Sequence, residues 1–242
     1  MAAAWQQDRW SDGGSRALVA ATSLDGGRNW TSTPLPFSRC GGGSVLNGGD
    51  YERASDPWVS YGPDGVLHAM SLSFSGGTFQ PGSANAMLAS RSFDDGRTWT
   101  AAATLIRDTD AAFNDKNAIT ADPHDARYVY AVWDRLTATG NRGPAYFARS
   151  TDGGAHWETA RPIFDPGARS QTIGNLIVVL SDGTLLDVFD RIDSPLGGLE
   201  TARAQVIRST DRGATWSAPI PVGDMLAIGA RDPTTGQAVR DG

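Results

Sequence analysis

The sequence predicts an all-β fold of the β-propeller type, because two short patterns repeat along the chain. The first is Ser-x-Asp-x-Gly-x-x-Trp, which occurs four times at intervals of about 60 residues. The second is a pair of apolar runs around a polar turn, which occurs three times between copies of the first. Together they indicate units of four antiparallel strands, and no convincing amphipathic helix interrupts them. Four-stranded units at this interval are typical of propeller blades.

Each copy of the first pattern, called a box below, has the chemistry of a hairpin turn. The Asp carboxylate can accept backbone N–H groups a few residues on, and the Gly supplies a positive φ. The Trp begins the next strand, so we expect Trp99, Trp157 and Trp216 to be largely buried between outer strands. We interpret the box aspartates as structural. The four boxes comprise Ser23, Asp25, Gly27 and Trp30; Ser92, Asp94, Gly96 and Trp99; Ser150, Asp152, Gly154 and Trp157; and Ser209, Asp211, Gly213 and Trp216.

The second pattern predicts the inner hairpins of the blades. They span 58–70, 118–133 and 176–186, with turns at 63–65, 122–127 and 181–183. The predicted organisation is a single partial propeller domain over 1–242. It comprises the end of one blade at 1–35, whole blades at 51–101, 113–160 and 172–219, and the start of the next blade at 220–242.

Composition excludes several classes of protein. The chain has 242 residues and a net charge of −6 without a Lys/Arg run, which argues against a nucleic-acid surface. No apolar run approaches the roughly 18 residues of a transmembrane helix. Cys40 is the only cysteine, which excludes an internal disulfide and a Cys-rich zinc site. The sequence indicates no cofactor or metal; a calcium ion in a turn stays open, although the aspartates lack calcium-loop spacing.

Strand order places the boxes on one rim of the propeller and the hairpin loops between second and third strands on the other, where we expect a ligand pocket near the axis. Basic residues recur on this opposite rim beside aspartates, which we expect to hold them in orientation. The guanidinium fork matches a carboxylate or sulfate; the alternative is ion pairs within blades and solvated loops. The residues are Asp8-Arg9, Asp134-Arg135 and Asp190-Arg191 at the ends of second strands, and Arg53, Asp56, Asp115 and Lys116 at the starts of first strands.

These patterns resemble the Asp-box propellers, or bacterial neuraminidase repeat proteins, whose best-known members are the sialidases. The boxes carry the resemblance, together with the run Val178–Leu185, which is similar to the family's Val-x-Leu-x-Asp-Gly-x-Leu. The resemblance implies a complete propeller of about six blades, which at this interval needs roughly 350 residues. We therefore expect the chain to be truncated at both ends. It also implies an extracellular or periplasmic protein, although residues 1–4 do not begin a signal peptide.

The resemblance also implies a site. Sialidases hold a sugar carboxylate with three arginines and use an Asp acid/base and a Tyr nucleophile assisted by Glu. Asp12 matches the acid/base position, the stretch 53–57 resembles the acidic start of the second blade, and Arg191 falls close to one family arginine. The chain departs from the pattern near Gly174, where the family Glu is expected. The first arginine motif and the Tyr nucleophile would lie outside 1–242.

Three functions remain open on this evidence. The first is a sialidase-like glycoside hydrolase acting on acidic glycans, and the second is a non-catalytic propeller that binds a glycan or a protein. The third is a lyase acting on uronate glycans, which needs a Tyr or His base; His68, His124 and His156 fall in a strand or on the box rim. A carbohydrate ligand is the expected partner. The oligomeric state stays open, although an unclosed ring exposes edge strands and predicts self-association.

Overall fold

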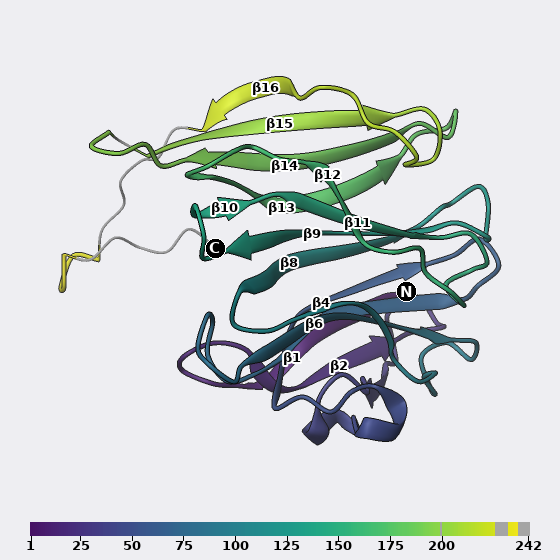
Figure 1. Cartoon of the computed structure of the whole chain (residues 1–242). Coiled ribbons are helices and arrows are strands. Elements are labelled where there is room, and N and C mark those ends of the chain that lie inside the picture. Colours follow the sequence, from purple (N-terminus) through teal and green to yellow (C-terminus); the bar gives the residue numbers. More distant parts are fainter. Residues whose placement is uncertain (199, 226–231, 237–242) are drawn as a thin grey trace.

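The computed structural model describes residues 1–198, 200–225 and 232–236, and its strands form four consecutive antiparallel blades (Figure 1). The all-β prediction is confirmed, since the described helices are two short 3₁₀ turns, Arg39–Gly41 and Val45–Asn47. Blade 1 contains β1 (Ala2–Arg9), β2 (Ser15–Thr22) and β3 (Thr31–Pro34); blade 2 contains β4 (Arg53–Tyr61), β5 (Leu67–Ser75), β6 (Ala84–Ser92) and β7 (Ala103–Asp108). Blade 3 contains β8 (Ala112–Ala121), β9 (Val129–Thr137), the short β10 (Arg142–Gly143), β11 (Ala145–Ser150) and β12 (Arg161–Phe164); blade 4 contains β13 (Ser170–Val179), β14 (Leu185–Asp193), β15 (Thr201–Ser209) and β16 (Ile220–Met225). None of the described helices is long and apolar enough to cross a membrane.

The inner hairpins lie where the sequence predicts them, as β4–β5, β8–β9 and β13–β14. The outer strands extend past the predicted boundaries: blades 2, 3 and 4 end at Asp108, Phe164 and Met225. The strand β16 therefore belongs to blade 4, although it falls in the segment interpreted as the start of another blade. The reason is that in these blades the fourth strand begins several residues after the box tryptophan.

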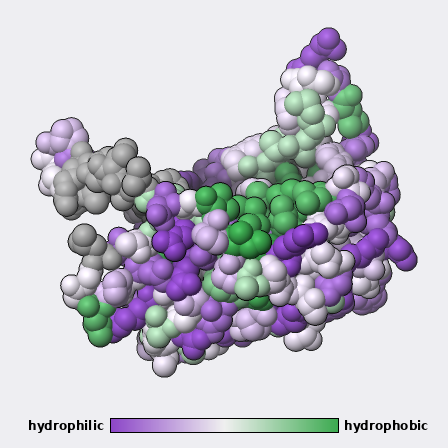
Figure 2. Space-filling view, turned by 90° about the horizontal axis from the view of Figure 1, so that it is seen from above, coloured by the Kyte–Doolittle hydropathy of each residue, from purple (hydrophilic) through white to green (hydrophobic). Residues whose placement is uncertain are grey.

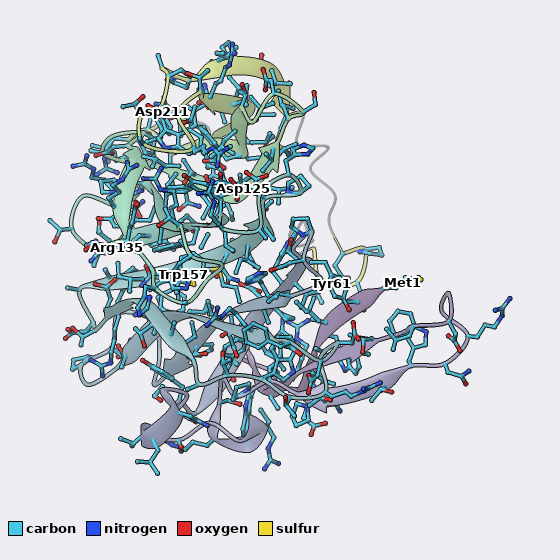
Figure 3. The ribbon with its side chains drawn as sticks, turned by 90° about the vertical axis from the view of Figure 1, so that its right-hand side faces the viewer. Met1, Tyr61, Asp125, Arg135, Trp157 and Asp211 are labelled. Carbon is cyan, nitrogen blue, oxygen red and sulfur yellow. The ribbon has the colours of Figure 1, made fainter. Side chains whose placement is uncertain are left out.

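All four boxes form the same hydrogen-bonded turn. In the box of blade 4, the Ser209 hydroxyl donates to Asp211 at 2.7 Å and accepts the Gly213 N–H at 2.8 Å. Thr215 donates its backbone N–H and its hydroxyl to the same carboxylate at 2.9 and 2.6 Å. Equivalent bonds, led by those from the residue before the tryptophan, lower the pKa of the box aspartate to about 2 in every blade. The boxes lie on the rim that faces the viewer in Figure 3, where Asp211 and Trp157 are labelled.

The box turns of blades 2, 3 and 4 also receive a hydrogen bond from the preceding blade. The donor is always the residue just before the preceding box serine, and the acceptor is the carbonyl just before the box glycine. Thr22 donates to Asp95 at 2.6 Å, Arg91 to Gly153 at 3.0 Å and Arg149 to Arg212 at 2.7 Å. The box thus closes its own hairpin and fastens that hairpin to its neighbour.

Three apolar cores fill the seams between blades. Leu18 and Leu88 pack at the first seam, Met70 and Trp133 at the second, and Tyr130, Phe147 and Leu185 at the third. The box tryptophans of blades 2, 3 and 4 pack against the seam with the preceding blade: Trp99 at the first seam, Trp157 at the second and Trp216 at the third.

Trp99, Trp157 and Trp216 are each mostly buried, as expected. They are covered at a seam between two blades, however, rather than between the outer strands of one blade, and part of each side chain faces solvent. Their indole N–H groups have no partner within the described residues. Trp30 belongs to the first described blade, has no preceding seam to cover and is 44% exposed.

We predict that Asp211→Asn destabilises the fold in a pH-dependent way. The folded pKa of Asp211 is about 2, below its ordinary value of 3.8, so its carboxylate contributes stability that is present above about pH 4 and lost as the pH falls through about 2. The loss of unfolding free energy in the variant should therefore be larger at pH 5 than at pH 2.5. Urea unfolding at the two pH values measures it; an equal loss at both would contradict a role for the charge.

We also predict that Arg149→Ala lowers the free energy of unfolding by about 1.5–3 kcal/mol, because a charged donor to the Arg212 carbonyl is removed from a seam. Arg97→Ala is the matched control. Arg97 lies exposed within the box of blade 2, and its loss should change the free energy by less than about 0.5 kcal/mol. Denaturant unfolding of both variants tests the seam, and similar values for the two would argue against it.

Candidate functional site

The first strands of blades 2, 3 and 4 each contain a β-bulge at the same register position. The bulged residues are Asp56, Lys116 and Gly174, which all have positive φ values of 50°, 48° and 69°. Positive φ strains any residue other than glycine, and such strain often marks a functional site. The three bulges therefore lie at equivalent positions along the inner strands. At this position blade 2 has an aspartate, blade 3 a lysine, and blade 4 a glycine without a side chain.

The three bulges line one pocket of about 610 Å³, together with part of β1. Two indole rings contribute to its wall, those of Trp5 and Trp58, which are 38% and 41% exposed. Polar groups come from the other lining residues, which include Gln6, Arg9, Asn117 and Asn175. An apolar wall with a few convergent polar groups is the usual form of a small-ligand site. A smaller cavity of about 140 Å³ beside His68 and Trp157 lies at the box rim and is part of the seam between blades 2 and 3.

Hydrogen bonds between blades hold the pocket together. The Asn117 amide donates to the Asp56 carbonyl at 3.0 Å and links blades 2 and 3. The Thr120 hydroxyl donates to the Ile177 carbonyl at 2.9 Å and links blades 3 and 4. The pocket is thus an assembly of successive blades rather than a feature of any single one.

The carboxyl groups of the pocket differ in their affinity for a proton. Burial raises the pKa of Asp115 to about 6, and the charge of Asp56 adds to this effect, while Lys116 opposes it. The Lys116 ammonium lies 4.0 Å from an Asp56 oxygen. Asp134, opposite Asp115 in the β8–β9 register, is fully buried, and neither of its oxygens has a partner within the described residues. Burial raises its pKa well above the ordinary value. A carboxyl of raised pKa, Asp115, therefore lies next to the pocket residues Asp56 and Lys116.

The register places the predicted basic residues at the strand ends opposite the boxes. In blade 3 the box serine Ser150 pairs with Val129 at one end of β9, whereas Asp134 pairs with Ala145 toward the other end. In blade 4 Ser209 and Asp190 are separated in the same way along β14. Asp8-Arg9 lies further along its strand than these pairs, at the β1–β2 turn where Arg9 pairs with Ser15. The three Asp-Arg pairs are therefore not strictly equivalent.

The predicted partners of the arginines require correction. Arg53, Arg135 and Arg191 form their ion pairs with Asp12, Asp108 and Asp193 at 2.6, 2.6 and 2.9 Å. The neighbours Asp8, Asp134 and Asp190 do not take this role, because successive residues of a strand point to opposite faces. Of the five predicted basic residues, Arg9 and Lys116 line the pocket.

Asp12 lies in the turn between β1 and β2 and holds Arg53 through two guanidinium nitrogens, at 2.6 and 3.3 Å. Its hydrogen bond with Arg53 lowers the pKa of Asp12. The Arg53 guanidinium also lies over the Trp10 ring, 4.9 Å from its centroid. An ionised carboxylate in an ion pair suits orientation of the arginine better than proton donation.

The sequence interpretation missed the residues Trp58 and Asn175 of the pocket and gave Asn117 no binding role. Their one common signal is position: Pro57, Asn117 and Asn175 each follow a bulged residue, and Trp58, Ala118 and Leu176 come next. The three segments 56–58, 116–118 and 174–176 share too little sequence to be aligned without knowing how their strands pair. Among the described residues, no group of three or more His, Cys, Asp or Glu side chains is arranged to hold a metal ion.

Comparisons with known proteins support the fold. No protein-family model matches the chain, and no curated protein matches it either. Its fold is similar to a Penicillium chrysogenum α-L-arabinanase complexed with arabinobiose, at 14% identity and a TM-score of 0.65, covering 92% of this chain and 60% of that one. It is also similar to a Dyadobacter fermentans protein described as of unknown function, at 19% identity and TM-score 0.58, covering 85% and 58%. A Hadza microbial sialidase matches at 18% identity and TM-score 0.58, covering 83% and 39%.

These similarities confirm the β-propeller fold, while the number of blades in a complete ring stays a prediction. The chain spans roughly two fifths to three fifths of the length of these three structures.

We predict that Asp56→Asn lowers the pKa of Asp115, because it removes a negative charge that favours the protonated carboxyl. Carboxyl ¹³C NMR titration of the two proteins measures the shift directly. Asp193→Asn, which removes a carboxylate paired with Arg191 outside this pocket, is the control and should leave the Asp115 titration unchanged. An unaltered Asp115 pKa in Asp56→Asn would show that the two carboxyls do not interact.

Proposed function

We propose that the chain forms the substrate pocket of a propeller glycoside hydrolase, in which Asp115 is the general acid. The observation that carries this proposal is a pair of interacting carboxyl groups on neighbouring inner strands. Asp56 lines the pocket beside the exposed Trp58 ring, and Asp115, next to the bulge of β8, has a pKa that burial and the charge of Asp56 raise to about 6. Glycosidases need a carboxyl of raised pKa to protonate the leaving oxygen and a second carboxylate to serve the anomeric carbon. The chain is similar in fold to arabinanase and sialidase structures, and this similarity supports a glycosidase reaction.

The proposed reaction uses groups of this chain in distinct roles. The Trp58 ring stacks against the sugar, and Asp115 gives its proton to the glycosidic oxygen as the bond from that oxygen to the anomeric carbon breaks. The Asp56 carboxylate stabilises the positive charge that develops at the anomeric carbon. A water molecule then adds to that carbon and gives a proton back to Asp115. Lys116 orients Asp56 through their 4.0 Å contact. Asp12, first expected to be the acid, is instead assigned to hold Arg53, because their ion pair favours its ionised form.

The sugar is proposed to be acidic, as in a sialidase. Arg9 and Lys116 line the pocket and can meet a carboxylate. A neutral sugar such as an arabinan is the second candidate, and one observation favours it: Arg53, Arg135 and Arg191 are already paired with carboxylates. A uronate lyase has less support, because no Tyr or His side chain lines the pocket in the described part of the chain.

We predict that Asp115→Asn lowers kcat at least about 100-fold on the substrate that the wild type hydrolyses, because a general acid contributes on that scale. The assay uses 4-methylumbelliferyl sialoside and arabinofuranoside side by side, which distinguishes the two candidate sugars. For the wild type, kcat/KM should fall above about pH 6 as Asp115 loses its proton.

The matched control is Asp110→Asn, an exposed aspartate near the start of the same strand, which should leave kcat unchanged. Thermal unfolding of both variants verifies that they fold. Sugar binding by the wild type without hydrolysis would favour the non-catalytic alternative, and equal activity of Asp115→Asn and wild type would remove Asp115 from the mechanism.

A further inference from the structure

The smaller cavity, of about 140 Å³, lies at the box rim between blades 2 and 3. Its walls come from β5, β6 and the start of β7 in blade 2, and from the box of blade 3, which includes the Trp157 labelled in Figure 3. The apolar patch seen in Figure 2 is on another side of the molecule, where blade 4 lies in Figure 1, and no described residue of blade 4 lines the cavity. Two blades in the interior of the stack therefore form it completely.

The repeat of the seam within the chain shows why a cavity forms at this place. Ala89 of blade 2 and Phe147 of blade 3 are equivalent, because each lies three residues before its box serine. At the third seam the buried Phe147 ring packs edge-on against the Trp216 ring, with the two centroids 5.5 Å apart. Ala89 has no ring to place against Trp157 in the same way. The cavity thus takes the space that a phenyl ring fills one blade further on.

Two ring nitrogens at the cavity are buried without a partner among the described residues. They are Nδ1 of His68, a residue that is 2% exposed, and Nε1 of Trp157. A Cβ at Gly154 would lie 3.2 Å from the His68 Nδ1, so this nitrogen faces blade 3. Burial lowers the pKa of His68 to about 4, while the charge of Asp64 raises it and that of Arg91 lowers it. His68 is therefore neutral at pH 7 and can present an Nδ1–H group to a ligand.

Arg91 brings a positive charge to the cavity and lacks the carboxylate that its equivalent has. Both Arg91 and Arg149 donate from Nη1 to the next blade. Arg149 also donates from Nε and Nη2 to Glu158, at 3.0 and 2.8 Å. The residue equivalent to Glu158 in blade 2 is Thr100, since each follows its box tryptophan. The Nε and Nη2 atoms of Arg91 accordingly have no partner within the part of the chain that the structure describes.

These groups favour an anion with hydrogen-bond acceptors. The guanidinium fork of Arg91 matches a carboxylate, and the two unpartnered ring nitrogens can donate to the same group. No acidic side chain lines the cavity among the described residues. A cavity of about 150 Å³ can hold a molecule as large as benzene, so the volume admits a carboxylate with a short alkyl tail. Small apolar side chains suit such a tail, and four of them line the cavity: Ala89, Ala101, Ala103 and Ala155.

We propose that the seam between blades 2 and 3 binds a short-chain carboxylate such as acetate. Its carboxylate accepts from Nε and Nη2 of Arg91, as the Glu158 carboxylate accepts from Arg149, and from the His68 and Trp157 rings. Its alkyl group lies against Ala89. The ligand thus supplies at the second seam the charge that the chain itself supplies at the third. Binding here is independent of the proposed activity, because no residue of the substrate pocket lines this cavity.

The proposal is tested by titrating the full chain with sodium acetate at about pH 7, with sodium chloride keeping the ionic strength constant. The ¹⁵N resonances of the His68 ring should change and saturate, with a dissociation constant on the order of 1–10 mM. The exposed His124 ring is the internal control and should not respond. Acetamide, a neutral molecule of the same shape, should bind at least about tenfold more weakly, because it lacks the charge.

Two substitutions copy the third seam into the second. Ala89→Phe adds the missing ring and Thr100→Glu adds the missing carboxylate, so each should weaken acetate binding at least about tenfold. Acetate should also raise the Tm of the wild type but not that of Thr100→Glu. Ala138→Phe, at an exposed residue between β9 and β10, is the control and should bind acetate like the wild type. Circular dichroism verifies that each variant folds.

Several results would overturn the proposal. One is a wild type whose His68 resonances show no saturable change up to about 100 mM acetate, a result that does not depend on any variant. Another is equal binding of acetamide and acetate, which would indicate a neutral ligand. The third is unchanged acetate affinity in folded Thr100→Glu, which would show that the Arg91 fork is not the binding group. Loss of glycosidase activity is not a readout here, so failure of the proposed function leaves these outcomes unaltered.

Discussion

The hydrogen bond from one blade to the box turn of the next is the interaction on which the rest of the structure depends. The box carboxylate fixes its own turn, and the fixed turn offers one carbonyl in a constant position to the residue before the preceding box. Thr22, Arg91 and Arg149 use that carbonyl although their side chains differ. The seam therefore requires a donor at this position but not a particular residue. A motif that looks like a local turn in sequence consequently also links neighbouring blades.

The glycine of the box shows why the motif tolerates so little change. A Cβ at Gly213 would lie 2.6 Å from the Phe147 ring of blade 3, and one at Gly96 would lie 3.0 Å from Thr22 of blade 1. These glycines also have φ values of 84° and 77°. The backbone conformation and the close packing thus both require glycine at this position of the box. The glycine is therefore kept in all four boxes and helps to make the repeat recognisable in the sequence.

The fold was predictable from the sequence because its signals are local and repeated. Turn chemistry and strand alternation gave the inner hairpins and the rim of the boxes. The partners of the arginines were not predictable: Asp108 lies at the end of β7 and Arg135 on β9, and only the packing of β7 beside blade 3 joins them. The bulges at Asp56 and Lys116 were missed for a related reason, since a bulge is a mismatch between two strands and has no signature in either strand alone. Most residues of the candidate site could therefore be identified only once the pairing of the strands was known, whereas the fold could be predicted without it.

The buried aspartates and the box aspartates change the stability of the fold in opposite directions as the pH changes. Asp187 occupies a position that is alanine in blades 2 and 3, Ala69 and Ala131, and neither of its oxygens has a partner among the described residues. Burial raises the pKa of Asp187 and of Asp134, so the fold binds their protons more tightly than the unfolded chain does. Their contribution to stability is present below about pH 4 and declines as the pH rises through the raised pKa values, whereas that of the box aspartates is lost as the pH falls toward 2. The two effects oppose each other as the pH changes. Because the pKa of Asp115 is raised to about 6, a mildly acidic pH keeps the proton of the proposed acid while the box carboxylates, with pKa values of about 2, remain ionised.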